Sequence, residues 1–304
     1  MPEKNQRREG RGPSRADQAK RHIAEMDRRY AAEIARSVEG TRVFDGAPKV
    51  AAQGCVPTVS VVDQDSVAAV LERGRGLASA CDLALLDFAS FTNPGGGYDR
   101  GAWAQEEALC SESFLFNVLR EKRDWYGENR RRYLNCNLYR NRALVVPRVR
   151  FERDGFHSYA DVIVAAAPNV RRAREEYHVS DEALLASLHD RVRLVMAIAD
   201  ELGHKKVVLG AFGCGAFGWD AATVAEAFRA ELASGTHVAS EVVFAIPRGR
   251  FDENLEVFEH VLAAFPQTND AAYVGRAERA EQEAARSATV EDDEDDEDDW
   301  RKYL

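Results

Sequence analysis

The 304-residue sequence has few cysteines, and they share no motif. The five are Cys55, Cys81, Cys110, Cys136 and Cys214, an odd number without a CxxC pair. This spacing argues against both a disulfide framework and a zinc-binding motif. The seven histidines form no HxH or HExxH pattern, so no metal site is expected either. We predict reduced thiols in a cytoplasmic protein, with a nuclear location left open for a eukaryotic source.

Long apolar runs are also missing. No window approaches the ~20 apolar residues that a membrane span needs, and the first residues, MPEKNQRREGRGPSRADQ, are too polar for a secretory signal. Two common nucleotide-binding motifs are absent, because no loop has the dinucleotide-binding GxGxxG pattern and no GxxxxGK[ST] occurs. We therefore expect a soluble protein without membrane contact, and we disfavour a nicotinamide oxidoreductase or an ATPase.

Excess charge is confined to one end of the chain. The formal net charge is −10, and residues 291–299 are nine consecutive acids, so the remainder is nearly neutral. A nearly neutral body gives no case for a basic nucleic-acid-binding face. An acidic run is typical of a solvated tail, and a regulatory role, such as screening a basic partner, is the less favoured alternative. We predict disorder over residues 1–14 and over an acidic tail of residues 269–304.

Hydrophobic periodicity predicts alternating strands and helices. Residues 15–40 are expected to form one long amphipathic helical extension, with Ser14 as N-cap and Gly40 at its end. The expected strands are 57–63, 82–90, 142–151, 160–168, 205–213 and 240–247, and the expected helices are 64–74, 103–121, 180–203, 221–235 and 252–265. Apolar strands alternating with helices predict an α/β domain, residues 41–268, with helices on both faces of its sheet.

Two glycine-rich loops each follow a predicted buried strand and precede a helix. The first is NPGGGYDRG, from Asn93, and the second is GCGAFG, from Gly213. In open α/β sheets, ligands bind at the carboxyl ends of strands, where glycine-rich backbone presents N–H groups to anions. A tight turn is the alternative for either loop alone. Two such loops in equivalent positions favour a site for a diphosphate.

Two adjacent glutamates, Glu106 and Glu107, follow the first loop. Neighbouring residues on a helix point about 100° apart, so the two carboxylates need different roles. One can face a reacting bond while the other holds neighbouring hydroxyls. The helix N-terminus lowers a carboxylate pKa, so a general acid here requires burial and a nearby anion to raise it. The alternative is a pair of acids that only stabilises the helix N-terminus.

The combination resembles a known family. GGG, a seven-residue spacer and QEE are similar to the GGG-x(6–8)-QEE signature of poly(ADP-ribose) glycohydrolases. The longer LLDFASFTNPGGGYDRGAWAQEEALC, with GAFGCGAFG downstream, resembles the microbial-type branch, and the resemblance covers about residues 15–265. It implies a macrodomain-like, three-layer α/β/α fold with a mixed central sheet. It also implies hydrolysis of the ribose–ribose bond of poly(ADP-ribose) without a cofactor.

The resemblance also assigns roles to the residues of the motifs. Glu107 becomes the general acid that protonates the leaving ribose hydroxyl and then activates water, and Glu106 holds ribose hydroxyls. The substrate-binding residues that it implies are Ser90, Asn93, Gly95, Gly96, Gly97, Gln105, Gly213, Cys214, Gly215, Ala216, Phe217 and Gly218. Among them Gln105 supports the first loop, and Phe217 packs on the terminal ribose. The partners are poly(ADP-ribose) or ADP-ribosylated proteins as substrate and ADP-ribose as product, bound by a monomer.

Two positions depart from the family pattern. Larger members carry FAN before the glycines, where this chain has Ser90, and Trp219 stands where a small or polar residue is expected. Both departures affect the ribose contacts and leave the glutamates intact. Microbial members act on chain ends, and the N-terminal helix is a candidate wall for that exo mode.

Other interpretations remain open. Hydrolysis of mono-ADP-ribose on protein or nucleic acid, and a non-catalytic ADP-ribose reader, are the alternative functions. Cys214 has no neighbouring histidine in sequence, which disfavours a nucleophile. The segment ENRRRYLNCNLYRNR, residues 128–142, is interpreted as an exposed, charge-dense connection, with contact to an acidic polymer as the alternative.

Overall fold

The computed structural model describes residues 12–50 and 54–282. Within them, the helices are α1 (Arg15–Gly40), α2 (Ser66–Arg73), α3 (Gln105–Ser111), α4 (Leu115–Leu119), α5 (Arg123–Arg132), α6 (Val170–Tyr177), α7 (Asp181–Leu202), α8 (Ala221–Leu232) and α9 (Asn254–Leu262). The strands are β1 (Arg42–Asp45), β2 (Thr58–Val62), β3 (Leu83–Phe88), β4 (Arg142–Arg153), β5 (Phe156–Ala165), β6 (Lys206–Leu209) and β7 (Glu241–Ala245). Among these helices none is long and apolar enough to cross a membrane.

The strands form one mixed sheet of seven strands in the order β1-β4-β5-β3-β6-β7-β2. The five strands from β5 to β2 are parallel, while β4 runs antiparallel to both β5 and β1. Pro147 interrupts β4 beyond the end of its pairing with β1, at an irregularity between Val146 and Val149. A proline cannot donate a ladder hydrogen bond, and it is tolerated there because the ladder is interrupted at this point.

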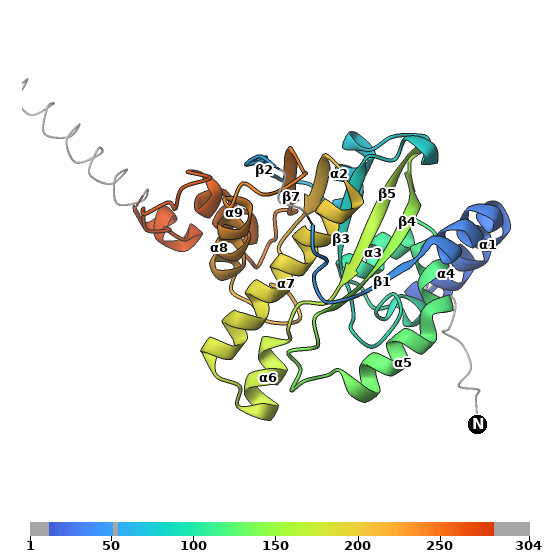
Figure 1. The fold of residues 1–304 in the computed structure, drawn as a ribbon, viewed down its shortest axis with the longest axis horizontal. Helices are drawn as coiled ribbons and strands as arrows, with labels where there is room; N and C mark the ends of the chain where they lie inside the picture. Colours follow the sequence, from blue (N-terminus) through green and yellow to red (C-terminus); the bar gives the residue numbers. More distant parts are fainter. Residues whose placement is uncertain (1–11, 51–53, 283–304) are drawn as a thin grey trace, which may run out of the picture.

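Helices cover both faces of the sheet, as Figure 1 shows. One hydrophobic cluster joins the sheet to α6, α7, α8 and α9, and the other joins it to α1, α2, α3 and α4. Strand β3 illustrates the division, because Ala84 and Leu86 belong to the first cluster while Leu83 and Leu85 belong to the second. The predicted α/β fold with a mixed central sheet between two helical layers is confirmed.

Helix α1 begins and ends where the sequence predicts. The Ser14 side chain accepts from the Asp17 N–H, and Ala19, Met26 and Ile34 are buried in the second cluster. The helix is not one regular rod, however, because Tyr30 departs from helical geometry with φ −123° and ψ 23°. The Tyr30 hydroxyl donates to Glu152 of β4, which ties the helix to the sheet at that point.

Four expectations about the elements are wrong. The helix predicted over residues 103–121 is divided into α3 and α4, because Ser113 pairs with Phe151 of β4 and the Glu112 carbonyl accepts from the Glu152 N–H. Segment 128–142 is not simply exposed: its first part belongs to α5, and Arg142 is buried. The sequence analysis also missed β1 and α6.

The fourth wrong expectation concerns the predicted tail. Residues 269–276 contact α9, since Asn269 donates to the His260 carbonyl and Arg276 pairs with the buried Glu256. The boundary at residue 268 is therefore too early. The rest of the predicted tail, from residue 283, and residues 1–11 of the predicted disordered start lie outside the described residues.

Candidate active site at the carboxyl ends of two parallel strands

The first glycine-rich loop leaves the carboxyl end of β3 and returns to the first turn of α3. Gly95 and Gly96 both adopt φ of +62°, a conformation that favours glycine. The loop is closed by its own backbone, since the Gly96 N–H donates to the Asn93 carbonyl over 3.1 Å and the Tyr98 N–H to the Gly95 carbonyl over 3.0 Å. The loop is thus shaped without help from a ligand.

Both glutamates of α3 turn back onto this loop and are buried, with exposed fractions of 3% for Glu106 and 6% for Glu107. An oxygen of Glu107, Oε1, accepts from the Gly97 N–H over 2.8 Å. An oxygen of Glu106, Oε2, accepts from the Ser90 N–H over 2.7 Å. The two carboxylates therefore hold different ends of the same loop, in agreement with the separate roles that helix geometry requires.

Gly96 is the point of closest approach between loop and carboxylates. A Cβ at this position would overlap Oε1 of Glu107 and lie 2.9 Å from Oε2 of Glu106. At Gly95 a Cβ would meet the Phe116 ring and the Cys110 sulfur. Glycine is required here by the protein's own groups, which differs from the expectation that these glycines leave room for a phosphate.

The N–H groups of Gly96 and Gly97 in the first loop already donate to acceptors within the protein. Gly97 donates to Glu107 and Gly96 to Asn93, so the prediction that both loops present free donors to a diphosphate is wrong for these two residues. Their position against the glutamates is nevertheless the feature that fixes the carboxylates in place.

The second loop, after β6, has the opposite character. Nothing lies within 4 Å of a Cβ built at Gly215, and Gly215, Ala216 and Gly218 are exposed. In the described part of the chain, the N–H groups of Gly215, Ala216 and Phe217 donate to no protein acceptor. Consecutive free N–H groups at the carboxyl end of a parallel strand suit an anion.

The buried side chain of Trp219 packs against the backbone of this second loop. It is buried, and its Nε1 donates to the Pro168 carbonyl over 2.8 Å. Its ring occupies the space that a Cβ at Gly213 would need, and Gly213 has φ of +81°. The unexpected tryptophan thus packs beneath the backbone, away from the exposed side of the loop.

Gln105 fastens the start of α3 to strand β3. Strand β3 pairs with β6 only as far as Leu85, while its pairing with β5 continues to Phe88. Along the edge that β6 leaves, Gln105 Oε1 accepts from the Phe88 N–H over 2.9 Å, and Gln105 Nε2 donates to the Leu86 carbonyl over 3.0 Å. The side-chain amide replaces a neighbouring strand and anchors α3 where the sheet opens.

Asp87, which sequence reasoning missed, adds a third acid beneath the glutamates. It is fully buried, and neither of its carboxyl oxygens has a hydrogen-bond partner among the described residues. Burial first, and the charge of Glu107 next, raise the pKa of Asp87 well above its usual value. Burial and the charge of Asp87 likewise raise the pKa of Glu106. A single acid inside the apolar run LALLDF was the available signal.

Polar side chains of the first loop are held by one another. Ser90 Oγ accepts from the Asn93 N–H over 3.2 Å, and Arg130 of α5 donates to Asn93 Oδ1 over 3.0 Å. Arg130 belongs to a pocket of about 290 Å³ beside this loop. The pocket is also lined by Arg100, Arg120 and Arg123. Of segment 128–142, Arg130 is the residue that lines this pocket, and Asp99 lines it beside the arginines.

An aromatic row connects the two loops. Phe91 of the first loop stacks on Tyr139 with centroids 4.5 Å apart, and Tyr139 meets Phe217 of the second loop edge-on at 6.1 Å. Sequence reasoning singled out Phe217 but missed Phe91 and Tyr139. Tyr139 has φ of +60°. No local sequence pattern predicts that its ring lies between the two loops.

A cavity of about 430 Å³ adjoins the loops at the carboxyl edge of the sheet. Its lining combines apolar side chains, among them Val67, Phe88, Trp103, Ala211, Ile246 and Pro247, with polar and charged ones, namely Asp65, Ser66, Gln105, Glu112, Arg153, Asp252 and Asn254. A cavity of this size and composition is typical of a small-molecule site. It lies on the Gln105 side of α3.

Cys214 is unsuited to nucleophilic chemistry. Burial, with smaller contributions from Asp220 and Asp252, raises the pKa of its thiol to about 12. The reactive form of a cysteine is the thiolate, so the expectation that Cys214 is a small loop residue stays the better interpretation.

Comparison with known proteins identifies the family. The sequence model described as "Microbial-type PARG, catalytic domain" matches residues 17–154. The poly(ADP-ribose) glycohydrolase of Thermomonospora curvata bound to the inhibitor ADP-HPD is 29% identical, with 80% of this chain and 97% of that chain covered and a TM-score of 0.67. The poly(ADP-ribose) glycohydrolase of Deinococcus radiodurans in complex with ADP-ribose is 30% identical, with 76% and 98% covered and a TM-score of 0.67. No curated protein sequence matches the chain.

The two solved structures share the macrodomain-like fold expected for this chain. The similarity extends over 98% of the Deinococcus radiodurans chain at 30% identity, which is more than a common fold requires. This chain belongs to the family of microbial-type poly(ADP-ribose) glycohydrolases.

Proposed function

We propose that this protein hydrolyses the ribose–ribose O-glycosidic bond of poly(ADP-ribose) and releases ADP-ribose. The observation that carries the proposal is the placement of Glu107, which is fixed by the Gly97 N–H at the carboxyl end of β3. The neighbouring strand β6 ends in a loop with free N–H groups. The Thermomonospora curvata relative binds the inhibitor ADP-HPD and the Deinococcus radiodurans relative binds ADP-ribose, which supports the same ligand class here.

Glu107 acts as general acid and then as general base. Its Oε1 is held by the loop, which leaves Oε2 to protonate the leaving ribose oxygen as the glycosidic C–O bond breaks. The same carboxylate then accepts a proton from the water whose oxygen bonds to the oxocarbenium-like carbon. One water is consumed, and the carboxyl group returns to its starting protonation state.

Glu106 orients the ribose. Its Oε2 is bound by the Ser90 N–H, while Oε1 is buried and has no hydrogen-bond partner among the described residues. A ribose hydroxyl that reaches Oε1 therefore meets an unoccupied acceptor. The raised pKa of Glu106 makes a proton-sharing hydrogen bond to a hydroxyl favourable. Ser90 and Asn93 hold the loop around this position.

The second loop binds the diphosphate, and the cavity receives the nucleoside end. Gly213, Cys214, Gly215, Ala216, Phe217 and Gly218 form the loop, whose exposed N–H groups face an anion without competition from protein acceptors. Phe217 presents its ring next to Tyr139, where it can pack on the terminal ribose. The apolar side chains in the lining of the cavity suit a base more than a phosphate.

We also propose an exo mode, in a monomeric cytoplasmic protein. Helix α1 lies against the first loop, where a Cβ at Gly101 would lie 3.0 Å from the Ala16 nitrogen. That position supports α1 as part of a wall beyond the terminal ribose. All five cysteines are free, as is usual in a reducing compartment. Release of ADP-ribose alone, without oligomers, is the expected product pattern.

The decisive experiment compares the wild type with Glu107→Gln on automodified polymer, mono-ADP-ribosylated protein and mono-ADP-ribosylated DNA. We expect the wild type to release ADP-ribose from polymer and Glu107→Gln to lose about 10²–10⁴-fold in kcat, with ADP-ribose binding retained. Glu121→Gln makes the same chemical change at an exposed position in the turn that follows α4 and should behave as wild type.

Each other outcome has a defined meaning. Full activity of Glu107→Gln contradicts the general-acid role. Binding of ADP-ribose by the wild type without turnover identifies a reader. Turnover of the mono-ADP-ribosylated substrates with intact polymer identifies the alternative hydrolase.

A further inference from the structure

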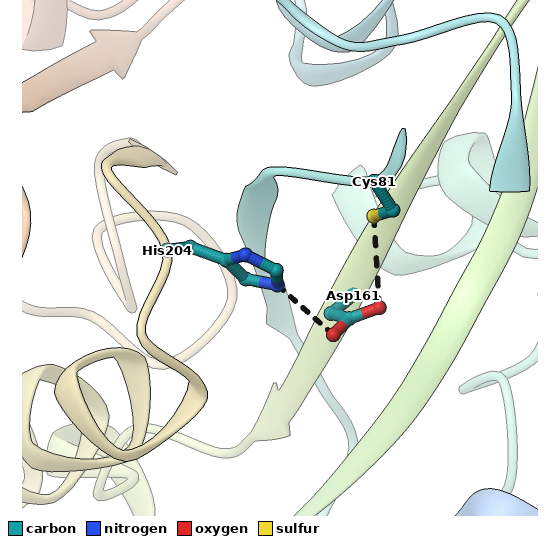
Figure 2. Close-up of side chains that lie close together, drawn as sticks. All are labelled: Cys81, Asp161 and His204. Carbon is teal, nitrogen blue, oxygen red and sulfur yellow. Dashed lines mark hydrogen bonds and ion pairs between the residues drawn. The ribbon is translucent and has the colours of Figure 1, made fainter. Parts of the chain in front are cut away.

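Three side chains capable of binding a metal lie close together near the amino ends of β3 and β6, whereas the glycine-rich loops follow the carboxyl ends of these strands. Cys81 precedes β3, Asp161 lies within β5, and His204 precedes β6. The carboxylate of Asp161 lies between the other two, as Figure 2 shows. Its Oδ2 is 2.9 Å from Nε2 of His204, and its Oδ1 is 3.7 Å from Sγ of Cys81. The three ligand atoms lie within 4.8 Å of one another.

The three positions converge because of the parallel sheet. Strand β3 pairs with both β5 and β6, and Asp161 is opposite Ala84 in the register. The chain segments that enter β3 and β6 therefore lie side by side at the amino ends of these strands, on the same side of β5 in the sheet order. No metal site was expected from the sequence, because metal-binding motifs consist of ligands that are close in sequence. Here Cys81 and Asp161 are 80 residues apart, and Asp161 and His204 are 43 residues apart.

The donor set fits zinc. Thiolate, imidazole and carboxylate are its usual ligands, at about 2.3, 2.0–2.1 and 2.0–2.2 Å respectively. Tetrahedral coordination at those lengths separates ligand atoms by about 3.3–3.7 Å. The ligand atoms of the three residues lie within 4.8 Å of one another, so side-chain movements on the order of 1 Å bring them to this geometry. A thiolate disfavours calcium and magnesium, which take oxygen ligands.

The electrostatic surroundings also favour a cation. The last turn of α7 contains no basic residue, and His204 follows its C-cap, Gly203. The negative end of the helix dipole therefore lies beside His204 in the chain, and the ammonium of Lys206, which follows, is paired with Asp82. The Arg148 N–H donates to Asp161 Oδ1 over 2.8 Å, which orients the carboxylate in the manner of an outer ligand.

A nucleophilic site is the main competing interpretation, and the geometry contradicts it. A cysteine nucleophile needs the histidine as its immediate neighbour, but here the carboxylate separates them. Burial, and next the charge of Asp161, raise the pKa of the Cys81 thiol to about 12. The thiol is therefore protonated and unreactive in the protein without a metal.

We propose that Cys81, Asp161 and His204 bind one Zn²⁺ ion, with water as the fourth ligand. Binding releases the thiol proton to solvent, and Nε2 of a neutral His204 donates its lone pair to the metal. The ion joins the segment before β3, the middle of β5 and the turn between α7 and β6. It lies away from Glu107, so it stabilises the fold without entering the hydrolysis, and its existence is independent of the proposed activity.

Metal titration of the full chain tests the site. After metal is removed with a chelator, the wild type should bind one equivalent of Zn²⁺ and unfold at a higher temperature with it. Co²⁺ in its place should show the ultraviolet thiolate-to-cobalt absorption. Cys81→Ser should abolish that absorption, and Cys81→Ser and His204→Gln should each weaken Zn²⁺ binding by about 100-fold or more, beyond the loss typical of outer-shell partners. The control Cys136→Ser alters an exposed cysteine and should keep both signals.

Two results would overturn the site. One is a wild type that binds no stoichiometric Zn²⁺, which would leave the cluster as a hydrogen-bonded group. The other is a cobalt absorption that persists in Cys81→Ser, which would place the metal on another cysteine. Circular dichroism of both ligand variants, with His204→Gln as the second, separates loss of a ligand from loss of the fold.

Discussion

At Gly96 the backbone turns with φ of +62° directly against the carboxylates of Glu106 and Glu107. At Gly215, in the other loop, a side chain would meet nothing within 4 Å. Both are glycines in loops that follow neighbouring strands, but the first is required by contacts within the protein, and no contact within the protein requires the second. A matched pair of substitutions can separate the two requirements.

We expect Gly96→Ala to lower the free energy of unfolding by about 2–4 kcal/mol, because the methyl group would overlap a buried carboxylate in a strained backbone conformation. Gly215→Ala should change stability by no more than about 0.5 kcal/mol. It should weaken ADP-ribose binding by about tenfold, equivalent to 1.4 kcal/mol. Urea unfolding and calorimetric titration with ADP-ribose measure both effects. Unchanged ADP-ribose affinity in Gly215→Ala would remove the second loop from the binding site.

Individual site residues were predictable where a motif states them. Glu106, Glu107 and the two glycine loops stand out because adjacent acids and runs of glycine are unfavourable in regular, buried structure. Asp87, Phe91 and Tyr139 did not stand out, because their contacts come from residues distant in sequence. The use of the Gly97 N–H by Glu107 was equally hidden, since a sequence does not show whether a donor is already occupied.

At the scale of elements, helix α1 supports the first glycine-rich loop. The hydroxyl of Tyr98 lies 2.9 Å from Nδ1 of His22, and the Tyr98 ring packs edge-on against Phe116. Burial lowers the pKa of His22, which favours the neutral ring that can accept this hydrogen bond. This hydrogen bond connects a helix outside the predicted domain to the segment that holds Glu107.

Tyr98→Phe should therefore lower the free energy of unfolding by about 1 kcal/mol and reduce kcat/KM on polymer by about 3–10-fold, because a looser loop positions Glu107 less well. Tyr273→Phe is the matched control, since its hydroxyl bonds to Glu253 near α9. It should lose similar stability and keep full activity. Equal activities in the two variants would show that α1 does not support the loop.

The elements that sequence reasoning found are those with a clear apolar period. Helix α5 was missed because RDWYGENRRR has few apolar residues, and its buried members are Tyr126 and Asn129. Helix α6, VRRAREEY, has the same weakness and buries only Val170 and Ala173. The division of the predicted helix at Ser113 comes from pairing with β4, a tertiary contact that overrides local propensity.

At the scale of the whole molecule, buried acids make folding depend on pH. The pKa values of Asp87 and Glu106 are raised in the folded protein, whereas unfolded carboxyl groups titrate near pH 3.9–4.3. Between those limits the folded state binds more protons than the unfolded state. The contribution of these groups to stability is therefore fully present below about pH 4 and is lost as the pH rises through the raised values.

Asp87→Asn removes one of these titrations. Relative to the wild type, its free energy of unfolding should increase by more than about 1 kcal/mol between pH 4 and pH 8, since one pKa unit corresponds to 1.36 kcal/mol. Urea unfolding across this range measures the difference, and Asp190→Asn, on an exposed acid, should follow the wild type. A constant difference at all pH values would show that Asp87 titrates normally in the fold.

The two glycine-rich loops use their N–H groups differently, and this difference assigns ligand binding and bond cleavage to different loops in the proposed function. In the proposed function, the donors for the ligand are the free N–H groups of the loop after β6, while the Gly97 N–H of the first loop is used by Glu107, the proposed acid. Exchanging that acid for its amide leaves the recognition loop untouched. The Glu107→Gln chain should therefore serve as a reagent that captures and stains ADP-ribose chain ends without consuming them.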